Sequence, residues 1–184
     1  MRRALGNDFT ALGFCLLALA GCAPDSRPAR LGLQLAPATL GASISLQQHL
    51  LVERDGRARE FEAALEVDSE RIDLVVSALN RRVLSLHYDG RALESWRHPA
   101  LPPELRAEDV LEDLQLTLWP ADAVRRALPP GWRIEENGAR RILLAGESPV
   151  TEIDYSGATR WTGTVVVYNR RYGYRLTIQS VISQ

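Results

Sequence analysis

The feature that most constrains this chain is a series of short segments in which apolar and polar residues alternate. In residues 44–52 and 61–67 the side chains at every second position are apolar except for Gln48, and the pair Asp55-Gly56 lies between the two segments. A period of two is typical of a β-strand with one buried face, and Asp-Gly is a favoured hairpin turn. The two segments therefore predict a hairpin with one face toward water.

The same alternation recurs along the chain on both sides of one interruption. Further strands are expected at 72–76, 83–88, 92–96, 132–135, 140–144, 150–155, 161–168 and 174–182. Asn137-Gly138, the strongest hairpin signal in the chain, separates two of them. Short strands that follow one another through tight turns form antiparallel meanders.

In the middle of the chain the apolar period changes to three or four. Leu111, Leu114 and Leu118 recur at helical spacing, and acidic residues precede them, as suits a helix N-terminus. Pro120 stops or kinks the run, and a short second helix is expected at 121–127. The sequence thus predicts a mainly β protein with a helical insert: a curved antiparallel sheet, or incomplete β-barrel, whose concave apolar face is covered by a short helical lid.

The N-terminus has the layout of a bacterial lipoprotein signal. Two arginines follow the first methionine and precede an apolar stretch at 9–19. At about a dozen residues this stretch is too short to cross a bilayer core that needs roughly 20. The stretch leads into Leu-Ala-Gly-Cys at 19–22. This tetrapeptide matches the lipobox, in which the cysteine thiol takes a thioether-linked diacylglycerol. We therefore predict a signal peptide at 1–21 and a lipidated Cys22 as the mature N-terminus.

The residues after the lipobox indicate where the protein is sorted and how it is organised. Ala23 follows the cysteine, whereas lipoproteins that stay in the inner membrane usually have Asp at this position. We therefore expect an outer-membrane protein that faces the periplasm. Residues 22–41 contain several prolines and predict a lipidated tether, and residues 42–184 predict a single β-rich domain. Because Cys15 lies within the signal, the mature chain has no intramolecular disulfide available.

Composition argues against several classes of function. The formal net charge is −1, with 22 basic residues, all of them Arg, against 23 acidic ones, so the basic field that nucleic-acid binding requires is missing. The three histidines lack metal-ligand spacing. Residues 146–149, Gly-Glu-Ser-Pro, lack the second glycine of a nucleophile elbow. We expect a non-enzymatic monomer without metal or cofactor.

The overall layout resembles a known family. A lipobox, an opening hairpin, a meander, a mid-chain insert with Trp-Pro after a helix, and a closing hairpin resemble a family of short bacterial outer-membrane lipoproteins encoded beside aryl-polyene or fatty-acid-like biosynthesis genes. That family is similar in architecture to the lipoprotein carriers LolA and LolB. The resemblance implies a LolB-like fold, with a hydrophobic cavity that holds acyl chains, and it carries over Cys22 as the lipidation site.

Two functions are compatible with these features. The leading hypothesis is an anchored periplasmic lipoprotein that binds or transfers a lipidic molecule, such as an acyl chain, an aryl-polyene lipid or a lipoprotein, with the lipoprotein-sorting machinery as a candidate partner. The alternative is a structural or assembly lipoprotein that binds a protein partner and has no cavity. A shielded apolar void under the helices favours the first, and a filled core with an exposed apolar patch favours the second. The expected ligand contacts are Trp96, Leu111, Leu114, Leu118 and Trp119, which are equally compatible with a packed core.

We expect Cys22→Ala to abolish membrane retention, because the variant lacks the thiol that takes the lipid. Cell fractionation and incorporation of labelled palmitate measure the effect. Cys15→Ala, which changes the cysteine within the signal, serves as the matched control and should be acylated normally. Unchanged acylation of the Cys22→Ala protein would contradict the predicted anchor.

Overall fold

The computed structural model describes residues 30–183, so Cys22 and the predicted signal at 1–21 lie outside the described residues. The described part forms one sheet, two α-helices and a short 3-10 helix. In chain order the elements are η1 (Pro37–Leu40), β1 (Ile44–Arg54), β2 (Arg57–Val67), β3 (Ile72–Ala78), β4 (Arg81–Tyr88), β5 (Leu93–Arg97), α1 (Ala107–Leu118), α2 (Ala121–Ala127), β6 (Trp132–Asn137), β7 (Arg140–Ala145), β8 (Ser148–Tyr155), β9 (Gly163–Asn169) and β10 (Tyr174–Ile182).

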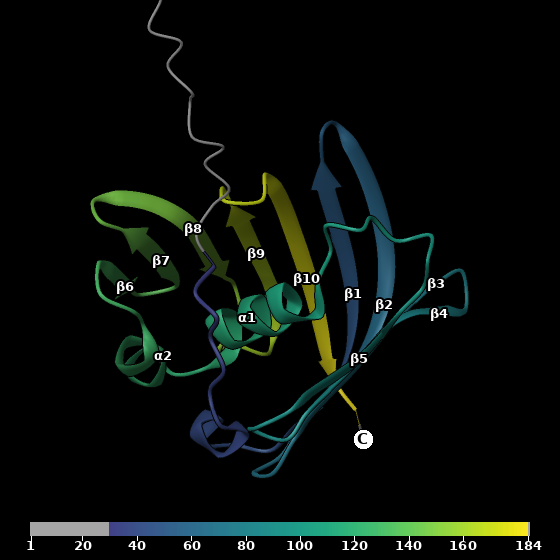
Figure 1. The fold of residues 1–184 in the computed structure, drawn as a ribbon, viewed down its shortest axis with the longest axis horizontal. Helices are drawn as coiled ribbons and strands as arrows, with labels where there is room; N and C mark the ends of the chain where they lie inside the picture. Colours follow the sequence, from purple (N-terminus) through teal and green to yellow (C-terminus); the bar gives the residue numbers. More distant parts are fainter. Residues whose placement is uncertain (1–29, 184) are drawn as a thin grey trace, which may run out of the picture.

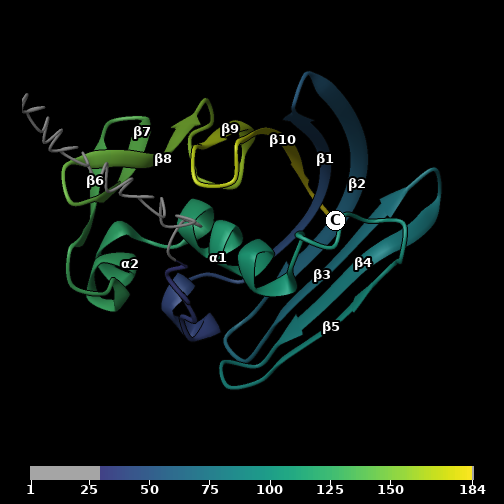
Figure 2. The ribbon, with the colours of Figure 1, turned by 45° about the horizontal axis from the view of Figure 1, so that its top comes forward.

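The ten strands form a single antiparallel sheet in the order β5-β4-β3-β2-β1-β10-β9-β8-β7-β6. The first and last strands pair at its centre, and each half of the chain continues outward as a meander. Strands β5 and β6 form the two edges, so the sheet remains open. Figures 1 and 2 show that it curls around α1. The predicted curved antiparallel sheet with a helical cover is confirmed.

Strand register explains the alternation seen in the sequence. Leu46 on β1 pairs with Leu65 on β2 and Ile182 on β10, and directly paired residues in antiparallel strands share one face of the sheet. Leu46 and Leu65 are buried on the concave face, whereas Glu62 and Glu66 of β2 are exposed on the convex face. The predicted hairpin therefore has its wet side on the outside of the curve.

The core lies between the concave face and α1. Leu111 in the middle of α1 and Leu116, Leu118 and Trp119 at its C-terminal end are almost fully buried. Burial contributes on the order of 2 kcal/mol for each large aliphatic side chain.

Residues 30–41, here called the entry segment, also form part of the core. Leu33, Leu35 and Leu40 are buried against the sheet and α1. The segment falls within the stretch 22–41, where a tether was expected. The described part of that stretch is thus packed into the domain.

One side of α1 holds the entry segment by hydrogen bonds that recur about once per helical turn. The helix contributes side chains three or four residues apart, which lie above one another on a helix. From the helix N-terminus onward the contacts are Asp109 with the Arg30 side chain (3.1 Å), Glu112 with the Leu31 N–H (3.1 Å), Gln115 with the N–H and the carbonyl of Leu35 (2.9 Å each), and the indole N–H of Trp119 with the Thr39 hydroxyl (2.9 Å).

A buried arginine closes the C-terminal end of α1. The Arg141 side chain, 0% exposed, reaches in from β7 and donates through Nη1 to the carbonyls of Leu116 (2.6 Å) and Trp119 (2.9 Å). These carbonyls have no partner within the helix. Glu136 pairs with the same guanidinium at 3.1 Å, so the positive charge is both compensated and placed where the helix dipole favours it.

A polar cluster joins α1 to the turn between β9 and β10. Glu112 and Arg171, each with a side chain 2% exposed, form an ion pair at 2.5 Å. Asn169 donates to the Asp113 carboxylate at 3.1 Å. Enclosure of this carboxyl group raises the pKa of Asp113 to about 7, opposed by the charge of Arg171 and reinforced by the charge of Glu112. Although part of the residue remains accessible, the carboxyl group itself is shielded from solvent.

We expect Gln115→Leu to lower the free energy of unfolding by about 2 to 4 kcal/mol, because the buried N–H and carbonyl of Leu35 each lose their partner. Urea unfolding measures the loss. Gln179→Leu, at an exposed position of β10, is the matched control and should change stability by less than about 0.5 kcal/mol. Equal stability of the two variants would show that the entry segment is not held by this side chain.

The raised pKa of Asp113 predicts a pH-dependent stability. The folded protein binds this proton more tightly than the unfolded chain, so the stabilisation is complete below the ordinary value of 3.8 and is lost as the pH rises through about 7. Asp113→Asn should remove a slope on the order of 1 kcal/mol per pH unit across this window and should make the protein more stable than the native chain at pH 8. The groups that face Asp113, namely Asp109, Glu112, Asn169 and Arg171, are unchanged in the variant.

Urea unfolding at a series of pH values tests this expectation. Asp122→Asn, which changes an exposed aspartate of α2, is the control and should leave the slope as it is. If Asp113→Asn and the native chain lose stability in parallel between pH 4 and pH 7, the proton is not held by Asp113.

Candidate functional site

The concave face is covered unevenly. On β1 and β2 the side chains of Leu46 and Leu65 are buried, but closer to the β1–β2 turn Leu50, Val52 and Phe61 are only partly buried. The helices and the entry segment therefore leave one end of the concave face incompletely covered.

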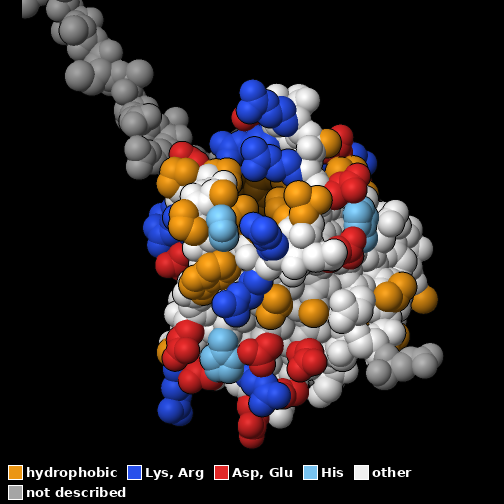
Figure 3. All heavy atoms as spheres, turned by 90° about the vertical axis from the view of Figure 1, so that its right-hand side faces the viewer, with side chains coloured by type: hydrophobic (Ala, Val, Ile, Leu, Met, Phe, Trp, Pro, Cys, Tyr) orange, Lys and Arg blue, Asp and Glu red, His pale blue; other side chains and the backbone are white. Residues whose placement is uncertain are grey.

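Register joins these partly buried side chains into one apolar surface. Leu50 pairs with Phe61 on one side and Ile178 on the other, and Val52 pairs with Leu176. Because paired residues share a face, these five side chains form two adjacent apolar rows across three strands. We call this surface the open end. Figure 3, which views the molecule from the side of β3 and β4, shows a hollow with hydrophobic side chains recessed inside it.

The chain just before α1 and the first part of the helix provide further apolar side chains that are not fully covered. Leu105, which precedes α1, and Val110 and Leu114 on the helix are partly buried and pack against the core. Figures 1 and 2 show the first turns of α1 in front of the central strands β1 and β10. Partly covered apolar side chains thus occur on this helix as well as on the sheet.

Arginines bound the open end on the side of β2 and β4. Arg59 pairs with Val52, Arg57 with Arg54, and Arg81 with Ala78, so the register places these arginines at concave-face positions. Arg57, Arg59 and Arg81 are exposed. Within residues 30–183, none of these three has an ion-pair partner. Figure 3 shows arginine side chains around the mouth of the hollow.

Acidic residues of the same strands lie on the other face. On β1–β5, β9 and β10 the concave positions are occupied by apolar, uncharged polar and arginine residues. None of the concave positions of these strands holds a carboxylate. The acidic residues of β1, β2 and β3 alternate with these positions and therefore occupy the convex face: Glu53, Glu60, Glu62, Glu66 and Asp73. The carboxylates of these three strands thus lie on the convex face, and the concave face carries arginines without them.

The convex face carries two shallow hollows and two histidine–carboxylate pairs. His49 lies 2.8 Å from Glu62 and His87 lies 2.7 Å from Asp73. The hydrogen bond with its carboxylate is the main cause that raises the pKa of each histidine above its usual range. Both pairs are accessible to solvent. Within the described part of the chain, no group of three or more His, Cys, Asp or Glu side chains converges as a metal site.

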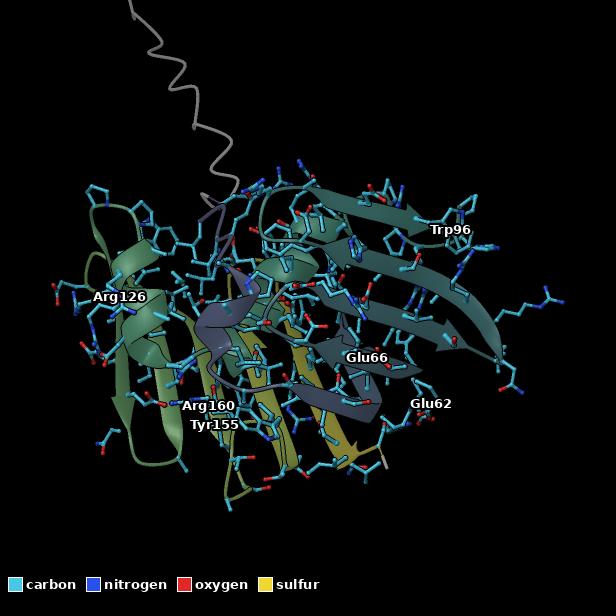
Figure 4. All side chains as sticks on the ribbon, turned by 90° about the horizontal axis from the view of Figure 1, so that it is seen from below. Glu62, Glu66, Trp96, Arg126, Tyr155 and Arg160 are labelled. Atoms are coloured by element: carbon cyan, nitrogen blue, oxygen red, sulfur yellow. The ribbon has the colours of Figure 1, made fainter. Side chains whose placement is uncertain are left out.

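The expected ligand residues do not all meet at one place. Leu111, Leu118 and Trp119 are buried in the filled core beneath α1, and Leu114 is partly buried on the same helix. Trp96 lies on the convex face, where the guanidinium of Arg82 stacks 4.7 Å from its ring centroid. Figure 4 shows Trp96 at the outer margin of the sheet, away from α1.

Sequence reasoning missed the residues of the open end. Leu50, Phe61 and Ile178 were predicted to lie on strands but were not singled out as ligand contacts. A signal was available, because Arg57 and Arg59 continue the alternation of Phe61 and therefore share its face. How far α1 covers those strands depends on tertiary packing, which the alternation does not report.

None of the helices in residues 30–183 has the length and apolar character needed to cross a membrane. No curated protein matches the chain. Among solved structures, the chain is similar to a LolA superfamily protein, NE2245 from Nitrosomonas europaea, with 11% identity and a TM-score of 0.37 over 79% of this chain and 88% of the other. It is also similar to a DUF1329 family protein from Desulfovibrio piger ATCC 29098, with 13% identity and a TM-score of 0.34 over 79% and 87% of the two chains.

A family match covers most of the described domain. Residues 45–182, from the first strand to the last, match the family described as "Protein of unknown function (DUF3261)". The match includes all ten strands and both α-helices. This chain therefore belongs to the DUF3261 family.

Proposed function

We propose that this protein is an outer-membrane-anchored periplasmic lipoprotein that binds a lipidic molecule at the open end of its concave face and hands it over to a partner. The observation that supports the proposal is the pair of apolar rows formed by Leu50, Val52, Phe61, Leu176 and Ile178, which α1 covers only partly. Apolar surface left accessible in a concave site is typical of ligand binding.

The chemistry of the open end suits an acyl chain. Its two rows carry aliphatic and aromatic side chains, and Figure 3 shows a hollow with hydrophobic side chains on one side of the molecule. Each methylene that such a surface removes from water contributes about 0.8 kcal/mol. An acyl chain laid across Phe61, Leu50 and Ile178 therefore gains free energy in proportion to its length, and a ligand of this kind needs few directed hydrogen bonds.

The proposed site differs from the expected cavity beneath the lid. Leu111, Leu118 and Trp119 are buried beneath α1, and Gln115 and Trp119 hold the entry segment against the helix. Binding at the open end does not require these contacts to break. Exchange with a partner is consistent with a site that is accessible from the surface.

The anchor is supported by the lipobox and by the way the chain enters the domain. Arg30 bonds to Asp109, and Asp109 also accepts from Tyr172 in the β9–β10 turn. That turn lies at the same end of the antiparallel sheet as the β1–β2 turn. Arg30 is eight positions after Cys22, a separation of at most about 28 Å in an extended chain, so a lipidated Cys22 would keep this end of the sheet near the membrane.

A second candidate function rests on the convex face. Val75 and Trp96 are each 41% exposed, and Val181 is 66% exposed. Exposed apolar side chains of this kind can bind a protein partner. This observation favours an assembly lipoprotein, in which the open end would stay empty.

The experiment that separates the two functions is native mass spectrometry of the full chain, extracted from host membranes in mild detergent. We expect a retained lipid in addition to the covalent anchor. The double substitution Phe61→Ser and Ile178→Ser should reduce the retained fraction more than tenfold, because each removes roughly 2 kcal/mol of apolar contact. Val75→Ser with Val181→Ser, on the convex face, is the matched control and should retain lipid as the native chain does.

A second variant guards against a trivial loss of folding. Leu50→Trp fills the open end without removing apolar surface, and it should also displace the lipid while thermal unfolding remains cooperative. A native chain that retains no lipid, or equal retention in all variants, would reject the proposed site and favour the assembly function.

A further inference from the structure

We infer that the ligand at the open end is an anionic lipid, whose negatively charged head group is held by Arg57, Arg59 and Arg81 while its acyl chain lies on the apolar rows. The inference rests on the proposed function and specifies the class of ligand. It is carried by the arginines that bound the open end, not by the apolar rows themselves.

The arginines stand directly beyond the apolar rows. Along a strand, the next side chain on the same face is two residues away, or about 6.6 Å. On β2 the concave positions therefore run from Phe61 to Arg59 and then to Arg57, and Val52 lies beside Arg59 on β1. An acyl chain that lies across Phe61 brings its polar end to these guanidinium groups within one or two such steps.

The site is positively charged because nearby acidic residues face the other side of the sheet or already have a partner. The acidic residues of β1–β3 occupy the convex face, and Asp55 in the β1–β2 turn pairs with Arg54 at 3.5 Å. No carboxylate in residues 30–183 forms an ion pair with Arg57, Arg59 or Arg81. Three acidic residues of α1 face the entry segment or the β9–β10 turn, and each is already engaged by a partner: Asp109 by Arg30, Glu112 by Arg171 and Asp113 by Asn169.

Unpaired arginines around an apolar hollow suit a phosphate-bearing lipid better than a neutral one. Guanidinium groups bind phosphate oxygens through two parallel hydrogen bonds. A zwitterionic head group of the same size would bring a positive charge toward the same arginines, and repulsion would offset part of the gain. The structure therefore favours a phospholipid with net negative charge over one with none.

The test uses the full chain in nanodiscs that contain equal amounts of palmitoyl-oleoyl phosphatidylglycerol and palmitoyl-oleoyl phosphatidylcholine, followed by native mass spectrometry of the lipid that the released protein retains. The two lipids share their acyl chains and differ in the charge of the head group. We expect the native chain to retain phosphatidylglycerol with a preference of about tenfold.

The key variant carries Arg57→Gln, Arg59→Gln and Arg81→Gln, and it should retain the two lipids in nearly equal amounts. Its control carries three substitutions that cause the same change in net charge away from the open end: Arg82→Gln, Arg91→Gln and Arg126→Gln. Arg82 stacks on the convex face, Arg91 lies in the opposite β4–β5 turn, and Arg126 lies on α2 (Figure 4). The control should keep the native preference.

Each other outcome is decisive. Equal retention of both lipids by the native chain, an unchanged preference in the key variant, or an equal loss in the control would overturn the inference and leave the proposed function standing. Full phosphatidylglycerol retention in the variant with Phe61→Ser and Ile178→Ser would also overturn it, because the arginines would then touch head groups only at the membrane surface. A native chain that retains neither lipid would reject the proposed function itself.

Discussion

The structure depends on covering the concave face of a sheet that cannot cover itself. Ten antiparallel strands curl around one side, and the two edges never meet. A single 12-residue helix is too short to bury that face, so the entry segment is recruited beside it. Gln115 is central to this arrangement, because it satisfies both backbone groups of Leu35 in the buried interior. Without that contact, the buried N–H and carbonyl of Leu35 would be left unpaired, because Leu35 lies outside the strands and helices.

Incomplete cover is the source of the candidate site. The helix and the entry segment close the core around Leu46, Leu65 and Trp119. Closer to the β1–β2 turn the side chains of the concave face are less buried. The same strands that supply the core thus supply a partly exposed apolar surface a few residues further along. Arg57 and Arg59 lie where this surface meets solvent. Fold and site are therefore two parts of one continuous face.

Most of the fold could be predicted from local patterns. Alternation located the strands, the pairs Asp55-Gly56 and Asn137-Gly138 located two turns, and the apolar period located α1, because each of these signals acts within a few residues. The entry segment was not foreseen as core. Its partners on α1 lie about 80 residues away in sequence, and no local pattern reports such a contact. Trp96 was expected among the ligand contacts on α1, and its strand was predicted, but the face on which it lies depends on pairing with β4.

The row of contacts between the entry segment and α1 has a mechanical consequence. The segment runs in the same direction as the helix, from Arg30 beside Asp109 to Thr39 beside Trp119. A pulling force applied at Arg30 along the helix axis would load these bonds in shear, all at once, instead of peeling them apart one by one. A domain tethered through this segment would therefore resist unfolding under a pulling force. The force would be transmitted directly to the helix that covers its core.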